Sequence, residues 1–177
     1  MLLKDKVCVI TGAGSPRGIG YATAQLFAEH GAKVVVLDVA VDSKTTNSIK
    51  AALPEEAGTV ADVYGIQCDI SNLAECKRAV DEIVARYGTI HCLVNSAGIV
   101  RGTPMLSIEG DEYDRILGVN LKGTFNLCQS VLPVLVASGA GSIVNLSSSA
   151  AQRGGGLVGG AHFAASKGGV IGLTCTS

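Results

Sequence analysis

The sequence predicts an α/β fold in which helices cover both faces of a parallel β-sheet, the doubly wound arrangement. Short apolar runs of strand length alternate with segments of helical spacing throughout the chain. The connections between these runs are long enough for the crossover helices that parallel pairing requires. No linker, repeat or low-complexity segment interrupts the alternation, so we expect a single domain over residues 1–177.

Composition excludes several classes of protein. The chain has 177 residues and is 47% hydrophobic, so it can bury a core and is not expected to be disordered. Its net charge is −1 and it has no basic cluster, which argues against nucleic-acid and membrane-surface partners. No apolar run reaches membrane-spanning length, and the first residues are too charged for a signal peptide. We therefore expect a cytoplasmic protein.

The cysteines are expected to be reduced thiols. None belongs to a Cys-x-x-Cys pair, and several lie within apolar, strand-like runs. This pattern fits buried thiols in the cytosol better than disulfides or a metal site, so we predict no metal. The six are Cys8, Cys68, Cys76, Cys92, Cys128 and Cys175.

The segment from Lys6 to His30 predicts a phosphate site. Residues 6–11 form an apolar run typical of a buried strand, and residues 21–28 have helical spacing that Gly31 is expected to end. A turn with four glycines separates the two. Glycine allows close backbone approach, and a helix N-terminus presents unpaired N–H groups to an anion. We therefore expect a nucleotide diphosphate here. The glycines are Gly12, Gly14, Gly18 and Gly20.

Four further strands and four further helices are predicted downstream. Ser71 or Asn72 can cap the third helix of the chain and Gly88 can end it, while Pro133 is expected to bend the fourth. A glycine-rich loop at residues 154–160 precedes the last helix. The strands are expected at residues 33–38, 60–68, 90–95 and 142–147, and the helices at 43–53 (closed by Pro54), 73–87, 108–137 and from about Ala161.

Ligands of such sheets bind beyond the carboxyl ends of the strands, where the sequence places two carboxylates. Asp38 can accept hydrogen bonds from an adenosine ribose and repel a 2′-phosphate, or it can be a solvated strand end. Arg17 could instead grip a 2′-phosphate, or point to water. We favour NAD over NADP because a carboxylate beneath the ribose rejects the phosphate directly. Asp69 could receive the adenine amino group or only cap the next helix.

Five motifs, taken in order, resemble those of the short-chain dehydrogenase/reductase family, and the resemblance covers the whole chain. It implies a Rossmann fold with strand order 3-2-1-4-5, a bound NAD(P)(H), and hydride transfer between a secondary alcohol and a ketone. The motifs are Thr11-Gly12 with Gly18-Ile19-Gly20, Asn95-Ser96-Ala97-Gly98, Val119-Asn120-Leu121-Lys122-Gly123, Leu146-Ser147-Ser148 and Ala165-Ser166-Lys167.

The resemblance also implies roles for single residues. Asn120 matches the asparagine that organises a proton-relay water, and Ser148 matches the serine that holds the substrate oxygen. Lys167 matches the lysine that binds the nicotinamide ribose and lowers the pKa of the neighbouring acid. Without the family, these three would be interpreted as a helix-interior amide, a turn serine and a surface lysine. The expected cofactor-binding residues are Gly12, Ser15, Arg17, Gly18, Ile19, Gly20, Asp38, Asp69, Ile70, Asn95, Ala97, Gly98 and Lys167.

The chain departs from the family pattern in four places. The glycine turn has two extra residues near Ser15-Pro16. Ser148 precedes Phe163 by more residues than usual, so Ser149 remains a possible substitute. Phe163 stands where the family has its catalytic tyrosine. Finally, the chain stops at Ser177, before the further strands and the substrate-covering segment of family members. That stop is expected to leave the strand at residues 143–144 as a bare sheet edge.

Phe163 is the departure with the largest expected consequence. Reduction of a carbonyl develops an alkoxide that needs a proton, and phenylalanine keeps the ring but has no proton to give. His162 is adjacent and titratable, but one step along a helix turns it about 100° away. We therefore expect impaired turnover. The alternatives are a non-catalytic NAD-binding pseudoenzyme, or a structural partner that forms a homo-oligomer through the two long helices.

Overall fold

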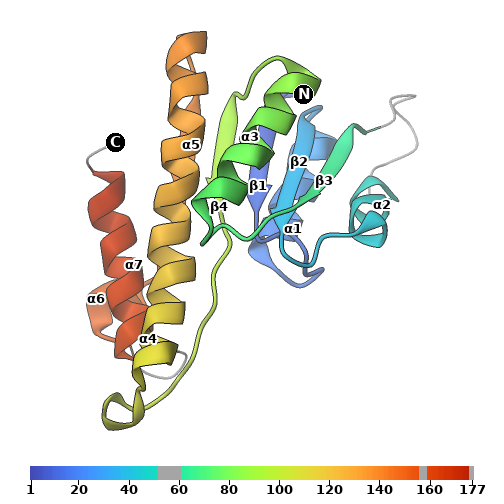
Figure 1. Cartoon of the computed structure of the whole chain (residues 1–177). Helices are drawn as coiled ribbons and strands as arrows, with labels where there is room; N and C mark the ends of the chain where they lie inside the picture. Colours follow the sequence, from blue (N-terminus) through green and yellow to red (C-terminus); the bar gives the residue numbers. More distant parts are fainter. Residues whose placement is uncertain (52–60, 156–158, 176–177) are drawn as a thin grey trace.

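A computed structural model describes residues 1–51, 61–155 and 159–175 (Figure 1). Within these residues the chain forms a five-stranded sheet with the order β3-β2-β1-β4-β5, in which all neighbouring strands are parallel. The predicted fold class and strand order are therefore confirmed. The strands are β1 Val7–Thr11, β2 Lys33–Asp38, β3 Val63–Gln67, β4 Cys92–Asn95 and β5 Ser142–Asn145.

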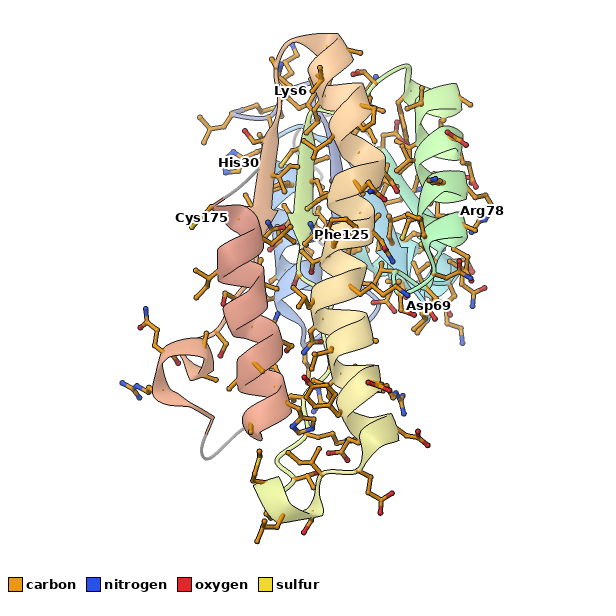
Figure 2. All side chains as sticks on the ribbon, turned by 60° about the vertical axis from the view of Figure 1, so that its left-hand side comes forward. Lys6, His30, Asp69, Arg78, Phe125 and Cys175 are labelled. Atoms are coloured by element: carbon orange, nitrogen blue, oxygen red, sulfur yellow. The ribbon has the colours of Figure 1, made fainter. Side chains whose placement is uncertain are left out.

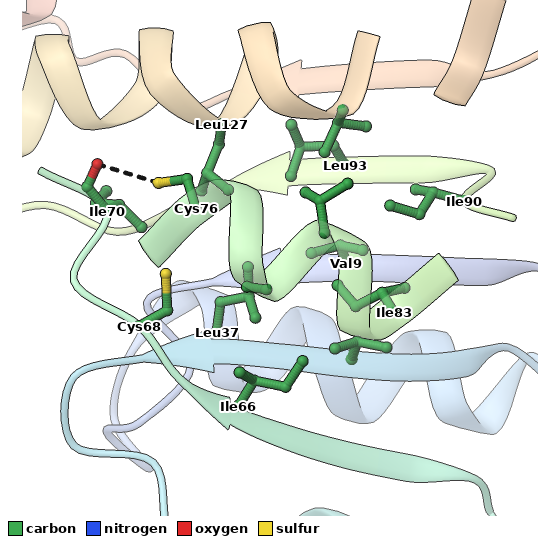
Figure 3. Packing of buried hydrophobic residues seen from close by; sticks show 14 of the residues in the cluster. Val9, Leu37, Ile66, Cys68, Ile70, Cys76, Ile83, Ile90, Leu93 and Leu127 are labelled. Carbon is green, nitrogen blue, oxygen red and sulfur yellow. Dashed lines mark hydrogen bonds between the residues drawn. The ribbon is translucent and has the colours of Figure 1, made fainter. Parts of the chain in front are cut away.

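Helices cover both faces of this sheet. Because side chains alternate along a strand, Val7 and Val9 of β1 point to the face covered by α3 and α5, whereas Cys8 and Ile10 point to α1 and α2. Figure 3 shows the first of these two cores. The helices are α1 Ile19–Glu29, α2 Ser43–Ala51, α3 Leu73–Tyr87, α4 Gly110–Leu117, α5 Gly123–Ser138, α6 Ala150–Arg153 and α7 Ala161–Thr174. Among the described residues, no helix combines the length and apolar character needed to cross a bilayer.

Local signals placed several elements correctly. The second strand and the third helix have the predicted bounds. Asn72 caps α3, since its side-chain oxygen accepts hydrogen bonds from the amides of Ala74 (3.0 Å) and Glu75 (3.4 Å). Gly88 ends the helix in the left-handed conformation at φ 77°. Helix α3 therefore begins and ends where its capping residues predict.

Other predicted bounds were wrong by a few residues. β1 begins at Val7 rather than Lys6, and β4 begins at Cys92 rather than Ile90. The third strand runs from Val63 to Gln67, while its predicted start at Val60 and the predicted stop of α2 at Pro54 lie outside the described residues. The fifth strand ends at Asn145, two residues early, because the chain then turns toward α7.

The predicted continuous helix at residues 108–137 was also wrong. A 3₁₀ turn at Met105–Ser107 comes first, and α4 begins at Gly110. A π-helical turn, Gly118–Lys122, then separates α4 from α5, which continues through Pro133 to Ser138. Figure 1 shows α4 and α5 stacked end to end. The extra residue of a π turn changes which side chains face the sheet, and periodicity alone did not reveal it.

β5 lies at an edge of the described sheet, as expected. Val144 on this strand is 48% exposed. A short helix, α6, lies between β5 and the predicted glycine loop, and the sequence analysis had not predicted it. Residues 156–158 of the predicted glycine loop lie outside the described part of the chain.

His91 predicts a pH dependence of stability. The amide of Val7 donates to its Nδ1 atom at 2.9 Å, so that nitrogen must carry no proton in the folded chain. Burial, followed by the charges of Lys6 and Lys33, lowers the pKa of His91 below its ordinary value of 6.5. The unfolded chain therefore takes up the proton first, and the stability contributed by neutral His91 is lost as the pH falls through about 6.5.

We expect the melting temperature to decrease between about pH 7.5 and pH 5.5, and to decrease less in His91→Asn. An asparagine oxygen can accept from the Val7 amide without titrating in this range. Thermal unfolding followed by circular dichroism across this range measures both slopes. Equal slopes in the two proteins would show that His91 does not carry the effect.

Candidate functional site

A cavity of about 560 Å³ opens at the carboxyl ends of the first four strands and at the start of α1. It brings together residues from distant parts of the sequence, from Gly12 to Val119. Nine of the residues predicted to bind a cofactor line it: Gly12, Ser15, Gly18, Ile19, Asp38, Asp69, Ile70, Ala97 and Gly98. The other four predicted residues, Arg17, Gly20, Asn95 and Lys167, do not line this cavity.

Thr11 joins the glycine turn to the end of β4. Its buried hydroxyl oxygen accepts hydrogen bonds from the amides of Ser96 (3.0 Å) and Ala97 (2.9 Å). Gly12 has φ 72°, and a Cβ atom there would lie 2.6 Å from the Ala97 Cα. The two backbones therefore meet with no room for a side chain, and sequence reasoning had not given Thr11 a role of its own.

The start of α1 is equally close to β1. A Cβ atom on Gly20 would lie 2.7 Å from the carbonyl oxygens of Thr11 and Gly12. Gly18 precedes the helix without a side-chain cap, and Ile19 lines the cavity. The first amides of α1 are thus left to a ligand or to water, which is the arrangement expected of an anion site.

Asp38 faces this turn from the end of β2. One carboxylate oxygen accepts from the Gly14 amide at 2.9 Å and the other accepts from the Ala40 amide at 2.9 Å. The carboxylate is therefore held over the glycine turn, 24 residues away in the sequence. Arg17 is exposed on the outer side of the same turn.

Asp69 and Ile70 form the wall next to α3. A carboxylate oxygen of Asp69 accepts from both the amide (2.9 Å) and the hydroxyl (2.8 Å) of Ser71. The alternative role considered for Asp69, capping the next helix, is taken by Asn72. The Ile70 carbonyl accepts from the side-chain amide of Asn126 on α5 at 2.9 Å, which fixes this wall to the core.

Asn95 was predicted to bind the cofactor, but it does not line the cavity. It is buried, and its side-chain amide donates to the Asn145 oxygen at 2.8 Å and to the Cys128 sulfur at 3.4 Å. It therefore ties β4 to β5 and α5 beneath the cavity. The small residues that follow it, Ala97 and Gly98, form the surface of the cavity.

Asn120 lies in the π turn and binds the segment after β4. Its oxygen accepts from the Ile99 amide (2.8 Å), and its nitrogen donates to the Ile99 carbonyl (2.9 Å) and to the Ser166 hydroxyl (3.0 Å). Ser166 in turn donates to the Phe163 carbonyl at 2.7 Å. This buried serine connects Asn120 to α7, a role that its place beside Lys167 did not reveal.

Lys167 is a buried residue of α7 that faces the end of β5. Its ammonium group donates to the Leu146 carbonyl at 2.7 Å, and burial lowers its pKa. A Cβ atom on Gly98 would lie 3.6 Å from its Nζ atom, so the lysine lies just behind the cavity wall. Ser148 is half-buried and accepts from the Ala150 amide at 3.2 Å, whereas Ser149 is exposed.

Phe163 and His162 point to different surroundings. Phe163 is half-buried and packs against Gly159. His162 is 1% exposed, and its Nε2 atom lies 2.9 Å from a carboxylate oxygen of Glu112 on α4. His162 therefore connects α7 to α4, which agrees with the expectation that it does not replace the missing acid.

A second cavity of about 700 Å³ adjoins the first. The two share Ile99 and Arg115, and Glu112 also lines the second one. Arg115 and Val119 both line the first cavity, and neither had been predicted as a site residue. Among the described residues, no cluster of three or more histidine, cysteine, aspartate or glutamate side chains could hold a metal ion.

Comparison with known proteins gives consistent matches. The family model for short chain dehydrogenases matches residues 6–177. The chain is 45% identical over 177 residues to an uncharacterised short-chain type dehydrogenase/reductase, y4mP, of Sinorhizobium fredii, covering 98% of this chain and 67% of that protein. It is 39% identical over 176 residues to the 3-oxoacyl-[acyl-carrier-protein] reductase FabG of Thermotoga maritima, covering 99% and 68%.

Solved structures show the same fold. Levodione reductase has a TM-score of 0.85 at 36% identity, with 97% of this chain and 64% of that chain covered. NAD⁺-bound xylitol dehydrogenase has a TM-score of 0.86 at 29% identity, with 99% and 65% covered. The chain thus spans about two thirds of the length of the proteins it matches.

The close packing at Gly20 can be tested by Gly20→Ala. We expect a loss of about 1–3 kcal/mol in the free energy of unfolding, because the added methyl group meets two backbone carbonyls that cannot yield without moving α1. Urea denaturation measures the change. Gly168→Ala in α7 is the matched control, since its Cβ would meet nothing within 4 Å, and it should stabilise by up to about 1 kcal/mol. Similar effects of the two substitutions would contradict the tight contact.

Proposed function

The chain belongs to the short-chain dehydrogenase family, and from this membership we propose that its cavity binds a nicotinamide dinucleotide for the interconversion of a secondary alcohol and a ketone. The family consists of oxidoreductases that bind NAD(P). The observation that carries the proposal is the gathering of nine predicted cofactor residues around one cavity. We further propose that turnover is impaired, because Phe163 has no proton to donate.

The residues present fit a dinucleotide. Gly12 and Gly18 of the turn line the cavity without side chains, and the uncapped start of α1 offers amides to the charge of a diphosphate. Asp38 is already held over this turn by two backbone amides, where a ribose hydroxyl could take their place. Because a carboxylate repels a 2′-phosphate, we propose that NAD is preferred. Asp69 and Ile70 would flank the adenine.

The residues proposed to carry the reaction do not line the cavity themselves, but Lys167 lies behind Gly98 and Asn120 binds Ile99, and both Gly98 and Ile99 line it. When bound, the cofactor would supply or accept the hydride. Lys167 would bind the nicotinamide ribose from behind Gly98, and Ser148 would hold the substrate oxygen, with Ser149 as its substitute. Asn120 would order the proton-relay water, and its side chain is held in place by Ile99 and Ser166. The proton that a ketone oxygen needs has no donor at Phe163.

Phe163 also supports a second candidate function, a non-catalytic NAD-binding module. The two candidates share the same cofactor contacts and differ only in turnover. The names of the relatives span an acyl-carrier-protein ketone and sugar alcohols, so for the catalytic candidate we propose a small-molecule alcohol or ketone substrate.

We also propose that the chain forms a homo-oligomer through its long helices. Exposed apolar side chains lie on α4 and α5, including Tyr113 (43% exposed), Phe125 (45%) and Val136 (75%). Ile171 on α7 is 40% exposed. Figure 2 shows Phe125 on α5, with α7 beside the same helical column. Burial of such side chains against a second copy would remove apolar surface from water.

The cofactor preference is testable by fluorescence titration. We expect the chain to bind NADH at least about tenfold more tightly than NADPH, which is about 1.4 kcal/mol. Asp38→Ala should weaken NADH binding and reduce the difference, because both the ribose contact and the repulsion of phosphate are lost. Arg17→Ala serves as the control and should leave NADH binding unchanged. Tighter binding of NADPH that depends on Arg17 would reverse the assignment.

Restoring a proton donor should restore turnover. We expect Phe163→Tyr to raise alcohol oxidation by about 10²–10⁴-fold, the usual effect of a positioned general acid or base. NADH absorbance during incubation with small alcohols and ketones measures the rate. Phe163→Leu and the double variant Phe163→Tyr, Lys167→Met should show no such gain. Binding of NADH without turnover in Phe163→Tyr would favour the non-catalytic module.

A further inference from the structure

Two free thiols lie together beneath the cavity. Cys68 directly follows β3 and lines the cavity wall, and Cys76 lies in the first turns of α3. Their exposed fractions are 1% and 0%, and both belong to the same core cluster. Figure 3 shows the Cys68 sulfur directed toward α3, with Cys76 above it. The cavity is therefore the route by which a small oxidant could reach this pair.

The two thiols differ in character. The Cys76 thiol donates a hydrogen bond to the Ile70 carbonyl at 3.3 Å. Cys68 lines the cavity and Cys76 does not, so an oxidant that enters the cavity meets Cys68 first. We therefore expect Cys68 to react first, through its thiolate, which is the form of cysteine that reacts with oxidants.

We propose that Cys68 and Cys76 form a reversible disulfide that weakens dinucleotide binding, and that a bound dinucleotide protects the pair from oxidation. This inference rests on the proposed function. In the first step, the Cys68 thiolate attacks a peroxide, the O–O bond breaks, a sulfenic acid forms, and the released hydroxide takes up the proton that the Cys68 thiol lost on ionisation to give water. The Cys76 thiol then displaces the hydroxyl group from that sulfur as a second water. Two thiols lose two electrons, and one peroxide becomes two waters.

The cavity wall would transmit the effect of disulfide formation to the proposed dinucleotide site. A disulfide requires the sulfurs to lie about 2.05 Å apart and removes the hydrogen bond from Cys76 to Ile70. Asp69 and Ile70, which follow Cys68 directly, both line the cavity. Ile70 cannot shift toward α5, because its side chain already fills the space over Gly123, where a Cβ would lie 2.6 Å away. Movement of Asp69 and Ile70 would therefore change the shape of the cavity.

A second cysteine pair provides an internal control. Cys8 and Cys92 are partners in the register of β1 and β4, so they also lie side by side. Neither lines the cavity. A disulfide between them would be held within two neighbouring strands of the sheet and would leave the wall at Asp69 unchanged.

The test treats the full chain with hydrogen peroxide, with and without NADH, and maps the disulfides by mass spectrometry. Oxidation should yield the Cys68–Cys76 disulfide, and NADH should slow its formation. The oxidised chain should bind NADH about tenfold more weakly, and dithiothreitol should restore the affinity. Protection by NADH and weaker binding after oxidation are expected together, because coupling between two sites is reciprocal. Cys76→Ala should bind NADH normally and lose the response, whereas Cys8→Ala should retain it.

The possible results are distinguishable. Equal NADH affinity of the oxidised and reduced chains, or a response that survives in Cys76→Ala, would overturn the coupling. Oxidation of Cys8 and Cys92 in preference to Cys68 and Cys76 would overturn the site. If the reduced chain bound no NADH, the proposed function and the coupling would both fail, and the peptide map would still decide the disulfide. The map uses the wild-type chain, so it does not depend on the folding of any variant.

Discussion

The buried hydroxyl of Thr11 is the contact on which the rest of the structure depends. β1 is the central strand, and Thr11 at its end receives the amides of Ser96 and Ala97 from β4. A buried polar group must be paired, so this single oxygen fixes how the segment after β4 leaves the sheet. Gly12 then brings the two backbones so close that the cavity wall is built from main chain. Displacing either segment would separate the glycine turn from Gly98 and Ile99, the part of the cavity wall that Asn120 and Lys167 lie behind.

Local signals in the sequence predicted the parts of the fold that depend on nearby residues. The apolar run ending at Asp38, the cap at Asn72 and the stop at Gly88 each depend on neighbours within a few positions, and the structure confirms all three. The π turn around Asn120 and the positions of Ser166 and His162 depend on residues tens of positions away. His162, for example, lies near Glu112, 50 residues earlier, and no spacing rule connects them. The roles assigned to the site residues stay predictions.

The region around Phe163 is held together by side chains other than that of Phe163. Ser166 binds both the Phe163 carbonyl and the Asn120 amide, and Lys167 binds the Leu146 carbonyl. Each of these bonds satisfies a buried polar group, so each stabilises the fold whether or not the site turns over substrate. The bonds that hold α7 in place therefore do not use the side chain of Phe163, so they do not depend on the role proposed for that position.

The π turn at Gly118–Lys122 constrains changes in chain length. Each residue in a helix rotates the following side chains by about 100°, so deleting one residue here would turn α4 relative to α5 by that angle. Glu112 would then move away from His162, and Asn120 would move away from Ile99. Insertions and deletions in the π turn would therefore break these contacts between α4, α5 and α7. Substitutions of its exposed residue Lys122 would leave the orientation of α4 relative to α5 unchanged. The number of residues between α4 and α5 thus determines which of their side chains reach α7 and the segment after β4.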